Sequence, residues 1–371
     1  MKITSVQTYH LEHALPHLFG GATLFYSSRD TLLIKISTDE GLVGWGETAP
    51  LGAARAVIEE QLKPILIGQN PLDHRRLWRQ LWGPNFGNGL AVGGVDIALH
   101  DLRGKAVNRS IADLYGGRLR DRVPAYASAL SYIKGREAEQ HYAEDATVLV
   151  ERGFRAIKMR IGGQPVRRDL AAVTAVRAAV GPDIQLMADG NGAYTLPTAL
   201  QVGRELERLD LYWFEEPLPQ PHYAGYEVLT EKLDIALAGG EVLDSRGAFR
   251  EVILRRALDI VQPDISLCGG FAECLFVAEM ARLWGIQTMP HCYAGAILVA
   301  ATLQLLALLP VASWAHTTET PLLELDVIDN PFRDRLAGHP FQVRDGLVDV
   351  PTGPGLGITI DEDLVRHYQR K

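Results

Sequence analysis

The sequence has few cysteines and no long hydrophobic run. Its three cysteines, Cys268, Cys274 and Cys292, form no CxxC pair, and their odd number is typical of a protein from a reducing compartment. No apolar stretch approaches the roughly 20 residues of a membrane span, and the N-terminal residues lack the apolar core of a signal peptide. We therefore expect a cytoplasmic protein that makes no membrane contact.

An excess of basic charge is also missing. The formal net charge is −8, and acidic and basic residues are interspersed along the 371 residues. Binding to nucleic acid would favour a basic face, so this balance indicates a small-molecule partner instead. The hydrophobic fraction of 47% is ordinary for a globular protein, and the length suits one large domain plus a smaller one.

The first third of the chain predicts a mixed α+β segment. Residues 3–9 and 31–36 alternate as strands do, and residues 42–45 complete a hairpin turned at Asp39-Glu40-Gly41. Helical spacing follows over residues 53–67 and 90–114, and Gly116-Gly117 ends the second of these runs. We propose residues 1–122 as a capping domain.

Short apolar strands then alternate with helices, which is typical of a parallel sheet. Eight such units closing on themselves make a (β/α)₈ barrel, and we propose residues 123–324 for it. Residues 325–371 return to short strands and turns and are expected to rejoin the cap. The expected strands are residues 123–128, 156–161, 184–188, 212–214, 235–238, 260–264, 287–290 and 312–315.

Three consecutive expected strands end in a carboxylate. Asp189 lies in MADGN, Glu215 lies in WFEEP and Glu241 ends AGGE, at even spacing along the chain. The C-terminal ends of barrel strands converge on one face, where three carboxylates would repel one another without a cation. Oxygen ligands with no His or Cys nearby favour Mg²⁺ over zinc, and Mn²⁺ can substitute. The alternative is that each is a solvated acid at the start of a loop.

Two cations precede these carboxylates. In AIKMRIG, Lys158 and Arg160 are two residues apart, so on a strand both side chains point to the same face. A positive pair beside a carboxylate cluster suits an anionic substrate or an enolate. The alternative is an ordinary buried ion pair.

Two later strands offer a general base. Asp264 ends QPD and His291 ends MPH, and neighbouring parallel strands would bring the two side chains within hydrogen-bond reach. An Asp–His bond fixes the imidazole tautomer and raises its basicity. Cys292 is a poor partner for His291, because consecutive strand residues face opposite sides.

These motifs together resemble the mandelate racemase/muconate lactonizing group of the enolase superfamily. The resemblance runs along the whole chain, from GLVGWGE and GGVDIALHDLRGK through the carboxylate series to PTGPGLG. It implies a cap over a barrel that binds Mg²⁺, and abstraction of the α-proton of a carboxylate to give a metal-stabilised enediolate. We also expect a homo-oligomer.

The resemblance assigns roles residue by residue. It implies that Asp189, Glu215 and Glu241 are the metal ligands and that Asp264 and His291 are the dyad of the mandelate racemase subgroup. It also implies a glutamate after the eighth strand that donates to the substrate carboxylate. Glu324 in LLELD is favoured for this role over Glu319 in TTET.

One position departs from the family pattern. The family usually has Lys-x-Lys, whose second lysine is a base, but Arg160 stands at that position. The free-base fraction of arginine at neutral pH is on the order of 10⁻⁵ or less, so Arg160 suits a clamp for a carboxylate or enolate. A racemase needs two bases on opposite substrate faces, and this chain offers one, His291.

With one base, loss of a β-hydroxyl is the natural fate of the intermediate. We therefore predict a dehydratase of an acid sugar, an aldonate or aldarate, in which protonated His291 can also act as the acid. Two enzyme alternatives are a lactone cycloisomerase and an epimerase in which Lys158 replaces the missing base. A catalytically silent binding barrel is the alternative from another class, and the absence of a His-x-His near a strand end disfavours a metallohydrolase.

By family resemblance, substrate specificity comes from cap loops, here about residues 16–29 and 48–54. Gly20-Gly21 and Gly52 suggest a closing lid. The polar residues that we propose as substrate contacts, each of which could equally be loop surface, are His17, Tyr26, Arg29, Asn191 and Glu319.

Overall fold

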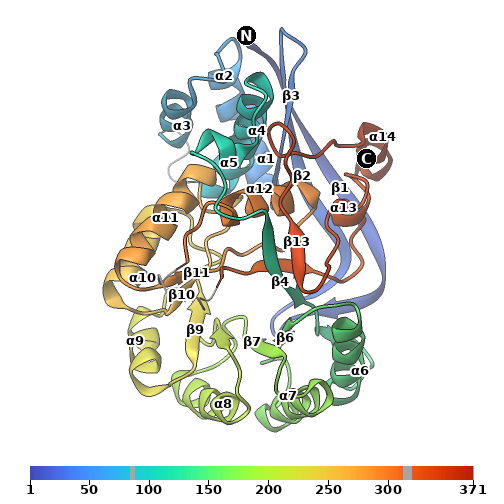
Figure 1. Ribbon diagram of the computed structural model, residues 1–371, viewed down its shortest axis with the longest axis vertical. Helices are drawn as coiled ribbons and strands as arrows, with labels where there is room; N and C mark the ends of the chain where they lie inside the picture. The colour runs from blue at the N-terminus through green and yellow to red at the C-terminus, as the bar shows by residue number, and fades with distance from the viewer. Residues whose placement is uncertain (84–87, 312–319, 371) are drawn as a thin grey trace.

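The protein is represented by a computed structural model that describes residues 1–83, 88–311 and 320–370. The N-terminal segment forms a four-stranded antiparallel sheet in the order β3-β2-β1-β5. Its strands β1 and β2 make one long hairpin that extends over the barrel, as Figure 1 shows in blue. The strands are β1 (Ile3–Gly20), β2 (Phe25–Thr38), β3 (Val43–Thr48) and β5 (Tyr132–Ile133).

Helices cover one face of this sheet. The expected helix over residues 90–114 is two helices, because Asn108 adopts a left-handed conformation (φ 53°) between α4 and α5. Helix α4 approaches strand β3 so closely that a Cβ at Gly44 or Gly46 would collide with helix backbone carbonyls. The helices are α1 (Gly52–Val57), a π-helix (Ile58–Leu62), α2 (Lys63–Leu66), α3 (His74–Trp82), α4 (Gly89–Ala106) and α5 (Ile111–Leu114).

Eight parallel strands form the barrel, as predicted, in the order β11-β10-β9-β8-β7-β6-β4-β12. The two ends of this order lie side by side, because Leu322 N contacts Met289 Sδ at 3.1 Å and Cys292 N donates to Glu324 Oε2 at 3.0 Å. The strands are β4 (Arg122–Ser128), β6 (Ala156–Arg160), β7 (Gln185–Asp189), β8 (Trp213–Glu215), β9 (Ala236–Gly239), β10 (Ile260–Val261), β11 (Gln287–Thr288) and β12 (Leu323–Asp326).

The strand that completes the sheet is β12, which spans residue 324, the barrel end proposed from the sequence. The strand expected at residues 312–315 lies outside the described residues. Side chains from alternate positions fill the barrel interior below the strand ends, with Tyr126, Met187, Trp213, Ile260 and Met289 in one buried cluster.

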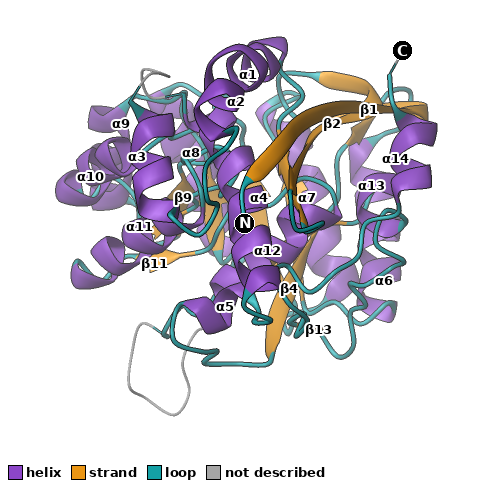
Figure 2. Ribbon diagram, turned by 90° about the horizontal axis from the view of Figure 1, so that it is seen from above, coloured by secondary structure: helices purple, strands orange, loops and turns teal. Residues whose placement is uncertain are grey.

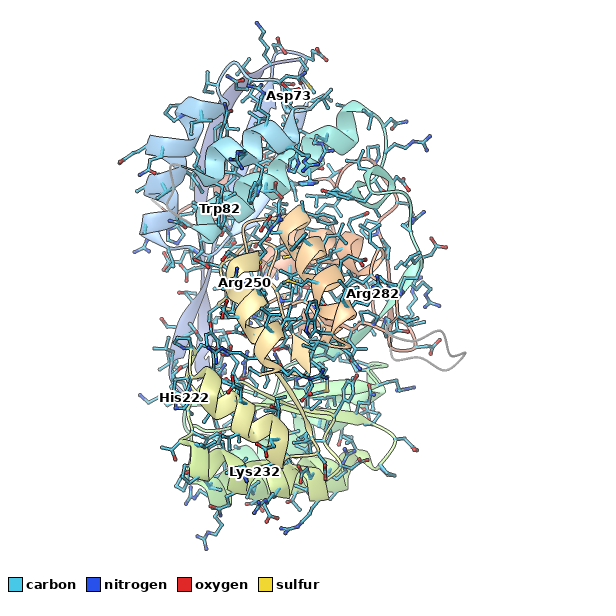
Figure 3. The ribbon with its side chains drawn as sticks, turned by 90° about the vertical axis from the view of Figure 1, so that its left-hand side faces the viewer. Asp73, Trp82, His222, Lys232, Arg250 and Arg282 are labelled. Atoms are coloured by element: carbon cyan, nitrogen blue, oxygen red, sulfur yellow. The ribbon has the colours of Figure 1, made fainter. Side chains whose placement is uncertain are left out.

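Helices surround the barrel on the outside. Figure 3 shows charged side chains such as Lys232, Arg250 and Arg282 on the outer faces of three of them. Helix α12 differs, because all of its residues are buried and it lies between the cap and the barrel strands (Figures 1 and 2). The helices are α6 (Ala138–Glu151), α7 (Val166–Val180), α8 (Leu196–Arg208), α9 (Tyr223–Lys232), α10 (Arg246–Arg255), α11 (Phe271–Leu283) and α12 (Ala296–Leu306).

The C-terminal segment contacts both parts of the molecule. Strand β13 (Leu347–Asp349) pairs antiparallel with β4, after the short helix α13 (Pro331–Asp334). Helix α14 (Glu362–Tyr368) packs against β1, and Lys35 of β2 binds Glu362 at 2.7 Å. Among the described helices, none is both long and apolar enough to cross a membrane.

Buried acids of the cap bind the first turns of two barrel helices. Glu47 accepts hydrogen bonds from Gly295 N (2.7 Å) and Leu298 N (3.0 Å) of α12, and Asp96 accepts one from Phe271 N (2.7 Å) of α11. Carboxylates at helix N-termini satisfy free N–H groups and complement the helix dipole. The cap is thereby fixed to the helices that follow the Asp264 and His291 loops.

We predict that Asp96→Asn destabilises the protein. Asp96 is fully buried, and His74 Nε2 (2.6 Å) and Phe271 N (2.7 Å) bind different oxygens of its carboxylate. An amide offers one acceptor in place of two and leaves a buried donor unpaired, at a cost of about 1–3 kcal/mol. The change should appear as a lower midpoint of urea unfolding.

Asp73→Asn is the matched control, because Asp73 is half-exposed and pairs with Arg76 on the surface of α3. Surface pairs contribute about 0–1 kcal/mol. Equal shifts in the two variants would show that Asp96 has no special role in joining the cap to the barrel.

Candidate active site

A cavity of about 410 Å³ lies at the C-terminal ends of the barrel strands, beneath the tip of the β1–β2 hairpin. The expected cap loop at residues 16–29 is mostly this hairpin, since only residues 21–24 lie between the two strands. The hairpin supplies Phe19, Leu24 and Tyr26 to the cavity wall. The barrel contributes Arg160, Asn191, Glu216, Glu241, His291 and Tyr293.

The three carboxylates of the predicted metal site lie at successive strand ends. Asp189 and Glu215 are the last residues of β7 and β8 and stand opposite each other in the parallel register. Both are fully buried, whereas Glu241, two residues after β9, is partly exposed to the cavity. Alternation along each strand turns Met187 and Trp213 inward below Asp189 and Glu215, so the barrel core supports the site from beneath.

Lys158 lies beneath the cavity, almost completely buried. Its Nζ is 2.5 Å from Glu215 Oε1 and 2.8 Å from Glu324 Oε1. Burial alone would lower the pKa of Lys158, but Glu215 and Glu324 outweigh it and raise the pKa well above its ordinary value. The side chain is therefore an ammonium while Glu215 and Glu324 hold it, and the epimerase alternative would need a bound cation to draw Glu215 away.

Arg160 makes an ion pair with Asp189 and lines the cavity. Burial would lower its pKa, but Asp189, Tyr293 and Glu241 raise it well above the ordinary value. Arg160 stays protonated, which fits the predicted clamp for an anion.

Asp264 and His291 form the predicted hydrogen bond, with 2.7 Å between Asp264 Oδ2 and His291 Nδ1. The other carboxylate oxygen of Asp264 accepts from both the backbone N and the hydroxyl of Ser266, each at 2.7 Å. When His291 Nδ1–H donates to Asp264, Nε2 is the basic nitrogen, and it lies 3.4 Å from Glu241 Oε2. Cys292 is buried and does not line the cavity, so it faces away from the side that His291 faces, as expected for adjacent residues.

The electrostatics of the site call for an added cation. Burial raises the pKa of Glu216 to about 9, helped by Glu241 and Asp189, and burial raises that of Glu215 to about 7, offset in part by Lys158. For His291, burial would lower the pKa, but Glu241, Glu324 and Asp264 outweigh it and raise the pKa to about 10. These raised pKa values mean that the negative charge at the site exceeds what Lys158 and Arg160 balance. A protonated His291 also cannot accept a proton, so it needs that excess to be offset before it can act as a base.

The residues present fit a divalent cation. Asp189, Glu215 and Glu241 offer oxygen donors only, the set that Mg²⁺ prefers. Among the described residues, the one group of possible metal ligands whose atoms all lie within 4.8 Å of one another is His74, Asp96 and His100. The three carboxylates at the barrel mouth are therefore spaced more widely than that. Lys158 and Arg160 hold Glu215 and Asp189, and a bound cation would compete for those oxygens.

The His74–Asp96–His100 cluster is explained by its hydrogen bonds. His100 Nδ1 contacts Asp96 O at 2.9 Å and its Nε2 contacts Tyr115 Oη at 2.7 Å, so both ring nitrogens have protein partners. Together with the His74–Asp96 bond, this network joins α3, α4 and α11 and leaves no need for a metal.

Glu324 lies within β12, fully buried. Its Oε2 accepts from Cys292 N and lies 3.8 Å from His291 Nε2. Burial would raise the pKa of Glu324, but Lys158 and His291 outweigh it and lower it. The predicted donation to a substrate carboxylate requires a proton on Glu324, which a second carboxylate beside it would favour. Glu319 lies outside the described residues.

The four other predicted substrate contacts are placed differently. Asn191 and Tyr26 line the cavity, and the backbone N of Asn191 donates to Asp189 Oδ1 at 2.8 Å. His17 is exposed on β1 and does not line the cavity. Arg29 is buried and pairs with Asp326 at 2.8 Å, so its charge already has a partner within the protein.

Sequence reasoning missed several residues of the site. Glu216 and Tyr293 line the cavity, and Gln262 Nε2 donates to Glu215 Oε2 at 2.9 Å. Gln262 lies two positions before Asp264, and Tyr293 lies two positions after His291. Residues two apart in an extended segment face the same side, so this spacing could have identified them as candidates for the site. The positive φ of Glu216 (36°), which departs from strand geometry, could not be read from the sequence.

We predict that Mg²⁺ lowers the pKa of His291. In the metal-free protein, the nearby carboxylates should hold it near 10; a divalent cation offsets their charge, so the value should fall toward the ordinary 6.5. An NMR titration of the imidazole resonances, with and without Mg²⁺, would measure this. The His291→Asn spectrum identifies the signal. An unchanged pKa would contradict a cation site at these carboxylates.

Comparisons with known proteins match both the N-terminal and the C-terminal parts of the chain. The model of the mandelate racemase/muconate lactonizing enzyme N-terminal domain matches residues 5–116, and the enolase C-terminal domain-like model matches residues 141–364. D-galactarolactone cycloisomerase of Agrobacterium fabrum is 36% identical over 100% of this chain and 99% of its own. Arabinonate dehydratase of Saccharolobus solfataricus is 34% identical over 91% and 90%.

A solved structure extends the similarity to three dimensions. The crystal structure of the 3,6-anhydro-D-galactonate cycloisomerase from Zobellia galactanivorans superposes with a TM-score of 0.89 at 30% identity. The match covers 100% of both chains, so the cap, the barrel and the C-terminal segment are all shared.

Proposed function

The chain belongs to the mandelate racemase/muconate lactonizing enzyme family of the enolase superfamily, and we propose that it is a Mg²⁺-dependent enzyme that removes the α-proton of an acid sugar and then expels the β-oxygen. Curated relatives of similar length are acid-sugar dehydratases and a lactone cycloisomerase. Dehydration of an aldonate or aldarate is the leading form of the reaction.

The observation that carries this proposal is that the three basic side chains at the site differ in their ability to accept a proton. Lys158 and Arg160 are held as cations by carboxylates, while His291 Nε2 lies at the cavity with Asp264 behind the ring. One base can attack one face of the α-carbon. Elimination of the β-oxygen needs no second base, whereas racemisation does.

Each side chain has a part in this reaction. His291 Nε2 takes the α-proton, and Asp264, itself held by Ser266, keeps the imidazole in the required tautomer. Arg160, a fixed cation on the cavity wall, binds the substrate carboxylate and stabilises the negative charge that develops on it. Mg²⁺, held by Asp189, Glu215 and Glu241, would supply further positive charge beside that carboxylate.

Lactone cycloisomerisation is the second candidate. Two relatives that span the complete chain, the galactarolactone and anhydrogalactonate enzymes, are cycloisomerases. The wall formed by Phe19, Leu24 and Val242 is apolar and suits a compact ring as well as an open chain. Assays with a panel of acid sugars and their lactones would separate the two. A cytoplasmic location and a homo-oligomeric assembly stay predictions from the sequence.

We predict that a chelator abolishes turnover and that Mg²⁺ or Mn²⁺ restores it. Charge-removing changes at the ligands, such as Asp189→Asn or Glu241→Gln, should reduce kcat/KM by at least about 10²-fold, while circular dichroism stays that of the folded protein. Full turnover by a metal-stripped sample would refute the metal assignment.

We predict that His291→Asn removes both turnover and α-proton exchange in D₂O. The loss should reach or exceed the roughly 10²–10⁴-fold that a general base contributes. Asp264→Asn should lose less, because the imidazole remains. The wild type should exchange the α-proton of one configuration only. Rapid exchange from both configurations would support a two-base racemase or epimerase, and exchange retained by His291→Asn would make Lys158 the base.

A further inference from the structure

We propose that Tyr293 is the acid that protonates the departing β-oxygen, and that Arg29 of the capping hairpin is its positioning residue. The inference rests on the proposed function, because it concerns the second half of the same elimination. It gives that half-reaction a proton donor distinct from His291.

Tyr293 lines the same cavity as His291 but contacts different side chains. It follows His291 by two residues, but its ring lies against Arg29 and Arg160, whose Cζ atoms are 4.9 and 5.7 Å from the ring centroid. His291 Nε2 instead faces Glu241 at 3.4 Å. Arg160 belongs to β6, which is separated from β11 in the barrel by β12 and β4. The ring of Tyr293 therefore lies on the β6 side of the cavity, whereas the imidazole of His291 lies beside Glu241, which follows β9.

Hydrogen-bond accounting leaves the hydroxyl proton of Tyr293 available. The guanidinium of Arg29 lies 4.9 Å from the Tyr293 ring centroid, and because a guanidinium has donors only, it cannot take up the phenol proton. Among the hydrogen bonds of the described residues, none has the Tyr293 hydroxyl as its donor. The O–H can therefore donate to a molecule in the cavity, which Tyr293 lines.

Arg29 is built as a clamp for this phenol. It is 7% exposed, binds Asp326 at 2.8 Å and donates from Nε to Asp329 O at 3.2 Å. It does not line the cavity, unlike Arg160, so it is poorly placed to hold a substrate carboxylate. Arg29 belongs to β2 of the hairpin that covers the cavity. Its contact with Tyr293 therefore links the position of the hairpin to the position of the phenol.

The electrostatic surroundings suit an acid for this step. Burial and Asp326 raise the pKa of Tyr293 to about 12, against the lowering effect of Arg29 and Arg160. The phenol is protonated throughout the neutral range, yet it is more acidic than water, whose pKa is about 15.7. Transfer of its proton to a departing hydroxide is downhill, and the two guanidiniums stabilise the phenolate that remains.

The elimination conserves atoms, protons and electron pairs. His291 takes the α-proton, the electron pair of the broken C–H bond becomes the new C=C bond, and the bond from Cβ to oxygen breaks with its pair on oxygen. That oxygen takes the proton of Tyr293 and leaves as water. The phenolate takes a proton from solvent, the protonated His291 releases its proton to solvent, and the enol product becomes the 2-keto acid.

Tyr293→Phe separates the two halves of the reaction. With Mg²⁺ and a turned-over acid sugar in D₂O, we expect product formation to fall by at least about 10²-fold, while α-proton exchange stays within about threefold of the wild type. An analogue with fluoride in place of the β-hydroxyl needs no protonation, so on it the variant should eliminate at close to the wild-type rate.

Tyr9→Phe is the matched control, because it removes a phenol hydroxyl from the cap sheet, where that hydroxyl donates to Gln7 at 3.3 Å. It should change neither rate. Unchanged product formation by Tyr293→Phe would overturn the proposal and leave His291 as the acid. Equal loss of exchange and product, unrelieved by the fluoro analogue, would also overturn it and assign Tyr293 to binding. A wild type that shows no metal-dependent exchange on any acid sugar would refute the proposed function itself.

Discussion

The crowding of carboxylates at the mouth of the barrel is the constraint on which the rest of the site depends. Asp189, Glu215 and Glu324 are fully buried there, with Glu216 and Glu241 beside them. Lys158 and Arg160 balance part of this charge, and the raised pKa values of Glu216 and His291 show that the balance is incomplete. The proposed divalent cation would supply what is missing and would free His291 to act as a base.

The same crowding fixes the roles of the basic residues. A lysine between two buried carboxylates cannot give up its proton, and an arginine has almost no neutral form at any physiological pH. His291 has one strong partner behind it, Asp264, and its other nitrogen lies at the cavity. The proposed division into one base and two fixed cations therefore follows from which side chains the carboxylates hold.

The motifs that carry the family resemblance outside the barrel mouth have a structural explanation. In GLVGWGE, Glu47 caps α12, and in GGVDIALHDLRGK, Asp96 caps α11. Asp101 accepts hydrogen bonds from Trp45 N and Leu356 N, each at 3.0 Å, and so joins strand β3 to the C-terminal segment. These buried acids hold the hairpin over the cavity, because they connect the cap to the helices behind the Asp–His dyad.

The sequence by itself determined the barrel, its metal-type carboxylates and the dyad, because each follows from local periodicity and from the residue that ends a strand. Only the tertiary structure decided which strand completes the sheet, that Arg29 is paired with Asp326, and that Glu216 reaches the cavity. Arg29 and Asp326 lie almost 300 residues apart, and Glu216 turns into the cavity through a backbone conformation that no pattern announces. Contacts of that kind depend on how the cap packs over the barrel, which hydrophobic periodicity and residue spacing do not encode.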